Sequence, residues 1–346
     1  MVPTSLIADQ MQTSATNIKP RPNEHILALP NGRQLEYADG GDISSGVVFL
    51  FFSGLFSVGM VAELPYAVTR LGAHYISPSP TGMGRTSPRP LSTPYHLNLI
   101  ADIRALLDHT HPEGIKALYL GGGSYGTAMA QMLHGAPYDQ FPQGRAIKAT
   151  LLMAGFSPFR YHTDYAQCLS WPNYISVGPP STLPFRFMQR LFSSVIAPKL
   201  RTVEGSRVFL SQTIFDKMNS DERAVMDSWL HTRSKTYHEF ITTMAENNVR
   251  SVANTWEGFM EVSEVLHSDW GFDPRTLDDA HAKPILVVSG AADDMGGATN
   301  QWITDSYPNA ILRTVPGGHI AGLFYMDELW DQLVTLGDTS VAIRSE

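Results

Sequence analysis

Residues 121–126 read GGGSYG. They follow the apolar stretch 115–120 and include the first residues of 124–134, which have helical spacing. The first stretch predicts a strand and the second a helix, so the glycines lie at a strand-to-helix turn. G-x-G-x-x-G, starting at Gly121, is typical of dinucleotide sites, where glycines let the backbone approach a pyrophosphate. G-x-S-x-G, centred on Ser124, is the nucleophile elbow, in which a serine occupies a tight turn. A glycine-rich turn without chemistry is the third interpretation.

The downstream sequence favours the nucleophile elbow. A dinucleotide site would need an acidic residue about 20 residues further on, at the end of the next strand. That strand ends in LLMAG, residues 151–155, which contain no acid, and at least three predicted strands precede the glycine cluster. The elbow instead requires an acid and then a histidine, each just after a strand. VVSGAAD ends at Asp293 and supplies the acid, and VPGGH ends at His319 and supplies the histidine.

These three side chains predict acyl transfer. A serine hydroxyl is a weak nucleophile near neutral pH, so it needs a base, and the base needs a third group that fixes its tautomer. We assign Ser124 as the nucleophile, His319 as the base and then the acid, and Asp293 as the group that orients His319. The adjacent Asp294 is the rival acid, and Asp293 is preferred because it lies three residues after Gly290.

A tetrahedral intermediate carries a negative oxygen that needs two backbone N–H donors. We expect the first donor at Tyr125, directly after the nucleophile. The second should come from the loop after the apolar stretch 47–52, where we choose Leu55 and keep Phe56 as the runner-up. The alternative interpretation of Gly54 in this loop is an ordinary turn at the end of a strand.

The rest of the chain divides into two kinds of sequence. Residues 21–156 and 282–346 alternate apolar strands with helices, which predicts a parallel sheet covered on both faces. Strands are expected at 25–29, 34–38, 47–52, 75–76, 115–120, 146–153, 285–289 and 310–315, and helices at 61–70, 98–109, 124–134, 299–306 and 320–336. Residues 157–281 lack long apolar strands and show helical periodicity, so they are expected to form a helical lid.

Composition narrows the functional classes. The 346 residues are 43% apolar and 17% charged, and 25 Lys and Arg against 33 Asp and Glu give a net charge of −8. An acidic chain without a basic run is a poor partner for nucleic acid. The single cysteine, Cys168, excludes an internal disulfide framework, and no stretch of about 20 apolar residues predicts a membrane span. Residues 1–20 lack the pattern of a secretory signal, so we expect a polar lead-in and a cytoplasmic protein.

Six ordered segments together resemble the α/β-hydrolase superfamily in its lid-bearing branch. They are LPNGRQLEYADGG, VVFLFFSGLF, SPTGMGRTSP, LGGGSYGTAMAQML, VVSGAADD and PGGHIAG. The resemblance implies an eight-stranded, mostly parallel sheet with helices on both faces, and it carries the family's triad over to Ser124, Asp293 and His319. Esterases, lipases and aminopeptidases share this branch, whereas its epoxide hydrolases and dehalogenases use a carboxylate nucleophile.

The chain departs from the family pattern at three places. Ser53 precedes Gly54 where the family usually has histidine, and Gly123 stands where a bulky residue often precedes the nucleophile. Ser79 and Thr81 occupy the loop that normally carries an acid and a basic residue. These departures affect the oxyanion loop and leave the triad residues unchanged.

We therefore expect a hydrolase that cleaves a carboxylic ester or lactone of a small hydrophobic substrate through an acyl-enzyme, without metal or organic cofactor. An aminopeptidase or amidase stays open, with Glu257, Glu261 and Glu264 as possible ligands of a free amine, although these glutamates equally suit a solvated helix face. A lyase, cyclase or ligand receptor on this fold also stays open, as does the oligomeric state.

His109 and His111 are expected to be solvated at a helix end rather than to bind metal.

Overall fold

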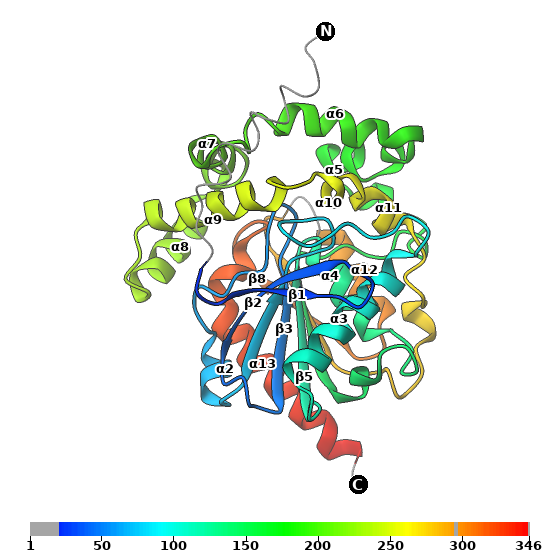
Figure 1. The fold of residues 1–346 in the computed structure, drawn as a ribbon. Helices are drawn as coiled ribbons and strands as arrows, with labels where there is room; N and C mark the ends of the chain where they lie inside the picture. The colour runs from blue at the N-terminus through cyan, green and yellow to red at the C-terminus, as the bar shows by residue number, and fades with distance from the viewer. Residues whose placement is uncertain (1–20, 294–296, 345–346) are drawn as a thin grey trace.

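The computed structural model describes residues 21–293 and 297–344 and forms an eight-stranded sheet between helices (Figure 1). The strand order is β1-β2-β4-β3-β5-β6-β7-β8. The strands are β1 (Glu24–Ala28), β2 (Gln34–Gly41), β3 (Val47–Phe52), β4 (His74–Pro78), β5 (Ala117–Gly123), β6 (Ile147–Met153), β7 (Ile285–Gly290) and β8 (Ala310–Val315). Strands β3 to β8 run parallel, whereas β2 is antiparallel to both β1 and β4. The predicted, mostly parallel sheet is thereby confirmed.

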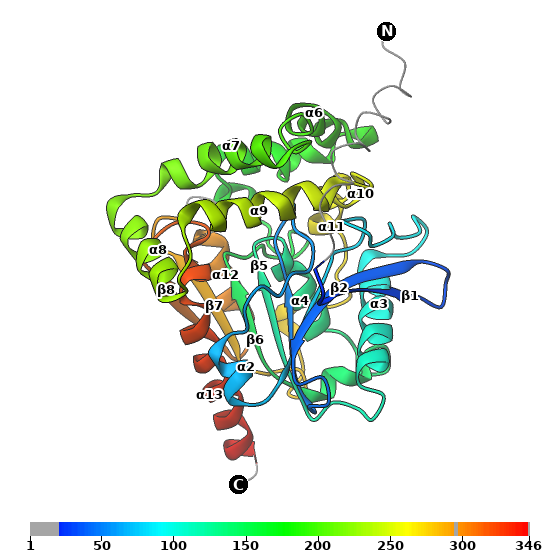
Figure 2. The same ribbon diagram turned by 60° about the vertical axis from the view of Figure 1, so that its left-hand side comes forward.

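Helices cover both faces of the sheet because the buried parallel strands are apolar on both sides. One face packs against α3 (Tyr95–Thr110), α4 (Gly126–His134) and α12 (Gly297–Ser306). The other face packs against α2 (Tyr66–Arg70) and α13 (Met326–Arg344). Figure 2 shows the long α13 lying along the sheet.

Two predicted helices differ from the observed ones. The helix expected at 61–70 is confined to α2, because Pro65 begins it and the residue before a proline is disfavoured in helical geometry. Residues 57–65 instead form an irregular segment that reaches the site described below. The helix expected at 320–336 is divided into a 3₁₀ turn, η7 (Ala321–Tyr325), and α13.

Residues 157–281, named here the helical segment, contain helices and turns and no strand. Its α-helices are α5 (Trp171–Ser176), α6 (Phe187–Ile196), α7 (Val203–Thr213), α8 (Ser220–Thr232), α9 (Tyr237–Val252), α10 (Glu257–Met260) and α11 (Val262–His267). Figures 1 and 2 show these helices gathered at one end of the sheet. Residues 21–156 and 282–346 are named here the sheet region. Helices α7, α8 and α9 share an apolar core of their own, and Phe324 of the sheet region packs into it.

Within residues 21–293 and 297–344, no helix is both long and apolar enough to cross a membrane. The polar lead-in expected at residues 1–20 and the rival acid Asp294 lie outside the described residues.

Candidate active site

Ser124 lies in a strained turn between two regular elements. Strand β5 ends at Gly123, α4 begins at Gly126, and the φ of Ser124 is +50°, in the left-handed region that non-glycine residues rarely adopt. The Ser124 N–H donates to the carbonyl of Met153, 2.8 Å away, and its own carbonyl accepts from the Thr127 N–H at 3.0 Å. Strain of this kind persists only where surrounding contacts enforce it, and it is concentrated at functional sites.

The glycines of the elbow pattern have a steric cause. A Cβ on Gly122 would lie 2.4 Å from the carbonyl oxygen of Gly126, and one on Gly126 would lie 2.1 Å from that of Phe52. Neither backbone can therefore accept a side chain. Gly121, which only the dinucleotide pattern requires, instead faces the ring of Trp330, so its role is packing. The local geometry thus favours the elbow over the dinucleotide motif.

Gly123 differs from its neighbours. A Cβ there would meet only Met153 Cε and Phe51 Cζ, both at an ordinary contact distance of 3.7 Å. Its φ is not positive, so the backbone does not demand glycine. The absence of a side chain at Gly123 therefore leaves space beside the serine instead of relieving strain.

The histidine and the acid predicted from the sequence meet at Ser124. The His319 Nε2 lies 3.0 Å from the Ser124 Oγ, and its Nδ1 lies 3.2 and 3.3 Å from the two carboxylate oxygens of Asp293. Asp293 follows β7 and His319 follows β8, and parallel strands bring such loops to one edge of the sheet. The Asp293 side chain is fully buried and that of His319 is 17% exposed. The structure thus brings together three residues from distant parts of the sequence.

The loop after β3 passes beside the serine, as expected for a source of oxyanion donors. A Cβ on Gly54 would lie 3.3 Å from the Ser124 Cβ, and Leu55 and Phe56 line the cavity in front of it. Phe56 has a φ of +58°, and its ring stacks on Phe259 with centroids 5.2 Å apart. The Tyr125 side chain is buried in the core, so only its backbone remains near the site.

A cavity of about 480 Å³ opens in front of Ser124. Its apolar lining from the sheet region includes Phe51, Leu55, Phe56, Met153, Ile320 and Leu323. Its apolar lining from the helical segment includes Phe209, Leu210, Ile214, Trp229, Phe240 and Met244. The two parts of the chain therefore enclose a common, mainly apolar space.

Most charged groups in the cavity lining are paired with one another. Arg233 contacts Glu63 at 3.0 Å and Asp327 at 2.6 Å, and Lys235 forms a second ion pair with Glu63. The Arg233 guanidinium also lies over the ring of Trp229, 4.4 Å from its centroid. These two cations and two carboxylates cancel, whereas the carboxylate of Glu239, which also lines the cavity, accepts hydrogen bonds from Thr236 at the start of α9.

The glutamates considered for amine binding have other partners. Arg186 pairs with Glu257 at 2.9 Å and with Glu264 at 3.0 Å, and Arg89 pairs with Glu261 at 3.2 Å. None of the three glutamates lines the cavity at Ser124. The expectation of a solvated face suits Glu257 and Glu264, which are half exposed, but not Glu261, which is buried. Burial raises the pKa of Glu261, and Arg89 offsets part of this rise.

The expectation that His111 is solvated was wrong, whereas His109 is exposed. The chain folds back after α3, and the His111 Nε2 lies 2.9 Å from the Nδ1 of the buried His74. Burial lowers the pKa of His111 to about 4. In the described part of the chain, no group of three or more His, Cys, Asp or Glu side chains is arranged to hold a metal ion.

Sequence reasoning missed two polar side chains from the helical segment that reach the site. The carboxylate of Glu222 in α8 accepts from the backbone N–H of Gly318, next to His319, at 2.8 Å. The amide of Asn247 in α9 binds the backbone of Val58 in the loop after β3. The helical periodicity of residues 157–281 predicted helices there, but nothing in the sequence indicated a long-range partner for either residue.

Comparisons with known proteins agree with this architecture. A model of the Alpha/beta hydrolase family matches residues 48–335. The chain therefore belongs to the alpha/beta hydrolase family, and this membership supports a hydrolase. No curated protein sequence matches the chain.

Solved structures with the same fold share little sequence with this chain. A bromoperoxidase from Bacillus anthracis is 14% identical with a TM-score of 0.59, over 90% of this chain and 99% of that one. A putative aryl esterase from Burkholderia cenocepacia is 14% identical with a TM-score of 0.54, over 93% and 100% of the two chains. An enol-lactonase from Burkholderia xenovorans LB400 is 15% identical with a TM-score of 0.54, over 90% and 99%. At these identities the likeness concerns the fold.

Proposed function

We propose that the protein is a serine hydrolase that cleaves carboxylic esters or lactones of small apolar substrates through an acyl-enzyme. The observation that supports this most strongly is the hydrogen-bonded series from Ser124 Oγ through the His319 ring to the Asp293 carboxylate. A base within reach of a hydroxyl, held in turn by a buried carboxylate, is the arrangement that activates a serine.

The first half of the reaction forms the acyl-enzyme. The His319 Nε2 removes the proton of Ser124 as the Oγ attacks the substrate carbonyl carbon. Asp293 holds the Nδ1 proton and stabilises the imidazolium that forms. The carbonyl oxygen becomes negative and accepts hydrogen bonds from the backbone N–H groups of Tyr125 and Leu55. One such donor contributes about 3–4 kcal/mol to transition-state stabilisation in comparable sites.

The first half ends when the imidazolium of His319 gives its proton to the leaving oxygen, so the ester bond breaks, an alcohol departs and the acyl-enzyme remains. The second half hydrolyses this acyl-enzyme. A water then loses a proton to His319 and attacks the acyl carbon, and Ser124 regains its proton when the carboxylic acid leaves. In a lactone the freed hydroxyl remains part of the acyl chain, so the second step releases a single hydroxy acid.

The cavity supports an apolar substrate and a lid role for residues 157–281. Its walls are mainly hydrocarbon and aromatic, and Arg233 and Lys235 are paired with carboxylates, so an uncharged molecule would be desolvated there at least cost. Helices α7, α8 and α9 contribute the wall that faces the strand ends, which is where a lid inserted between residues 21–156 and 282–346 belongs. Solved structures with this fold include a putative aryl esterase and an enol-lactonase, and both names agree with hydrolysis of an ester or a lactone.

The proposal is tested with a panel of p-nitrophenyl esters and lactones beside aminoacyl anilides. We expect esters or lactones to be hydrolysed and the anilides to be poor substrates. Ser124→Ala should reduce turnover to background, and His319→Ala should reduce it by several orders of magnitude. Anilide turnover above that of the esters, or activity that survives Ser124→Ala, would refute the assignment.

A further inference from the structure

We infer that the helical segment also holds the loops of Leu55 and His319 in position beside Ser124. Asn247 and Glu222 act as the positioning residues. This inference rests on the proposed function and extends it, because it assigns a role in catalysis to residues that do not face the reacting atoms. Each of the two side chains binds the backbone of a different loop of the sheet region.

Asn247 holds the loop that carries the proposed donor Leu55. Its Oδ1 accepts from the Val58 N–H at 3.2 Å, and its Nδ2 donates to the Ser57 Oγ at 2.7 Å and to the Val58 carbonyl at 3.3 Å. Val58 is fully buried and Asn247 is 5% exposed, so water does not replace these contacts readily. An amide that binds both the N–H and the C=O of one residue fixes the orientation of that part of the loop.

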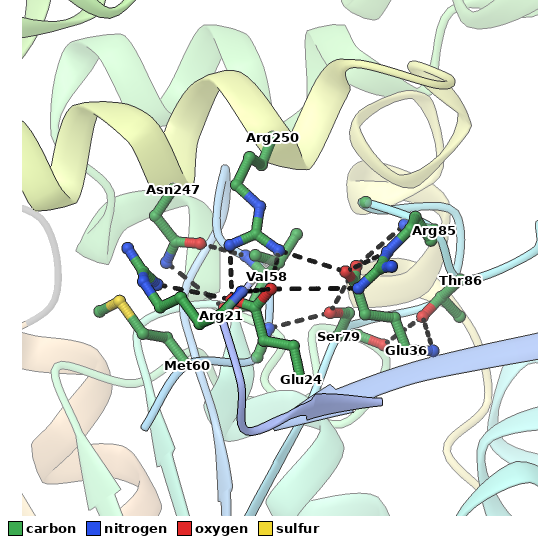
Figure 3. A network of polar contacts seen from close by, with 12 residues as sticks. Arg21, Glu24, Glu36, Val58, Met60, Ser79, Arg85, Thr86, Asn247 and Arg250 are labelled. Carbon is green, nitrogen blue, oxygen red and sulfur yellow. Dashed lines mark hydrogen bonds and ion pairs between the residues drawn. The ribbon is translucent and has the colours of Figure 1, made fainter. Parts of the chain in front are cut away.

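Helix α9 is itself fixed one turn further on, as Figure 3 shows. Arg250 forms a two-pronged ion pair with the buried Glu24, and its guanidinium also lies 3.5 Å from Glu36. Burial alone would raise the pKa of Glu24, but the hydrogen bonds and charge of Arg250 hold it below its usual value. Paired, buried charges of this kind resist sliding, because any displacement leaves a carboxylate without its partner.

The same network reaches the loop from its other side. The Ser79 hydroxyl donates to Glu36 at 3.2 Å and accepts from the Gly59 N–H at 2.9 Å. Gly59 therefore connects through Ser79 to Glu36, while Val58 connects through Asn247 and α9 to Arg250 (Figure 3). The serine at position 79, a departure from the family pattern, thus has a defined function in this chain.

Glu222 performs the corresponding task at the histidine. Its Oε1 accepts from the Gly318 N–H at 2.8 Å, one residue before His319. Gly317 lies so close that a Cβ there would come within 3.0 Å of the Glu222 Cδ, and its φ is +111°. The carboxylate therefore packs against a turn whose positive φ favours glycine, and it holds the backbone directly before His319.

A docked helical segment is consequently part of the catalytic apparatus as well as the wall of the cavity. If α8 and α9 moved away, the loops of His319 and Leu55 would each lose a backbone hydrogen bond. Misplacing a catalytic group by about 1 Å can lower a rate by about 100-fold. Hydrolysis would then proceed only when the segment is closed over the substrate.

The first test compares Asn247→Ala with Asn254→Ala. Asn254 also binds a backbone group of the sheet region, the Gly84 carbonyl at 2.8 Å, but it lies outside the cavity lining and does not bind the loop after β3, so Asn254→Ala is a matched control. Asn247→Ala should lower kcat roughly 10- to 100-fold with KM within about twofold, because the loop is displaced while the pocket is kept. The rate of labelling by a fluorophosphonate should fall in parallel. Equal kcat in the two variants would overturn the role of Asn247.

The second test uses Glu222→Gln and Glu222→Ala. The glutamine keeps an oxygen acceptor for the Gly318 N–H and the alanine removes it, so glutamine should retain kcat and alanine should lose about tenfold. The KM and the melting temperature of the glutamine variant should match the wild type. An alanine variant with full kcat, or a glutamine variant as impaired as alanine, would overturn the role of the hydrogen bond.

The wild type and Ser124→Ala separate this inference from the proposed function. A wild-type enzyme that loses activity with Ser124→Ala, but is unaffected by Asn247→Ala and Glu222→Ala, would retain the proposed function and overturn the inference alone. An inert wild type would overturn both.

Discussion

The sheet region and the helical segment contribute to the same site in different ways. The sheet region delivers three side chains, Ser124, Asp293 and His319, from the carboxyl ends of strands whose order fixes where those ends meet. The helical segment delivers no titrating group to the reacting atoms, but its Glu222 and Asn247 bind the backbone of the catalytic loops. Under the proposed function, the reacting side chains and the residues that position their loops therefore come from separate parts of one chain.

The largest effect should come from the elbow glycines of the sheet region. Gly122→Ala would push a methyl group to 2.4 Å from the carbonyl oxygen of Gly126, so the turn must shift and carry Ser124 with it. We expect kcat to fall by at least about 100-fold. The free energy of unfolding should fall by about 1–3 kcal/mol, the usual cost of overpacking. Ester kinetics and urea unfolding measure the two effects.

Gly123→Ala is the matched control for this change. Its methyl group would find only ordinary contacts, so kcat for small esters should remain close to that of the wild type. Equal losses in Gly122→Ala and Gly123→Ala would contradict the steric account of the elbow.

An intermediate effect is expected from the wall that the helical segment provides. Trp229 lines the cavity and packs against Phe240 and Phe324, with centroids 5.4 and 5.7 Å away. Trp229→Ala should enlarge the pocket and raise the ratio of kcat/KM for bulky over small esters by about tenfold, a typical value for pocket contacts. Trp171→Ala, at a tryptophan of the same segment that is 71% exposed, should leave this ratio unchanged. A similar shift in both variants would refute the assignment of this wall.

A smaller change in selectivity is expected at Gly123. Leucine at this position would project toward Phe51 and Met153 and occupy space beside the serine. Gly123→Leu should therefore lower kcat/KM for long-chain esters several-fold, by roughly 1 kcal/mol, while acetate esters are affected less. A series of p-nitrophenyl esters of increasing acyl length measures the shift. A uniform loss for all chain lengths would show that the space is not used by the acyl group.

The smallest expected effect concerns stability against acid in the sheet region. Burial lowers the pKa of His111 to about 4 and that of His134 to about 3, whereas both ionise near 6.5 when unfolded. The unfolded chain therefore binds more protons below pH of about 6.5, and the free energy of unfolding declines as the pH falls. The decline is at most about 1.4 kcal/mol per pH unit for each histidine. The charges of His281 and Lys283 also lower the pKa of His134, whereas a backbone hydrogen bond of His281 raises it.

Urea unfolding at about pH 7 and about pH 5 measures this decline. His134→Gln should reduce the difference between the two conditions, and the exposed His109→Gln should not. A difference that is unchanged in His134→Gln would contradict the role of this buried histidine.

The sequence predicted the sheet region well because its signals are local. Strand β3 was expected at its observed bounds, 47–52, since a continuous apolar run between turns has few other structures. Ser124 was found because the elbow requires glycines at fixed offsets, which the close approach of Gly122 and Gly126 explains. The fold class and the family followed from such segments.

The positioning contacts could not be predicted because their partners are remote in sequence. Glu222 binds a backbone group 96 residues away, and Asn247 binds one 189 residues away. Neither residue belongs to a spaced motif, and both partners are peptide groups without a side-chain signature. His111 was misjudged for the same reason, since it follows helix α3 and its partner His74 lies 37 residues away on strand β4.

The central claim is that Ser124 is a nucleophile activated by His319, and a covalent adduct tests it most directly. The protein is incubated with a fluorophosphonate, digested, and mapped by mass spectrometry. We predict one adduct, on the peptide that contains Ser124, absent in Ser124→Ala and formed much more slowly in His319→Ala. An unlabelled wild type, or an adduct on another residue that persists in Ser124→Ala, would contradict the account.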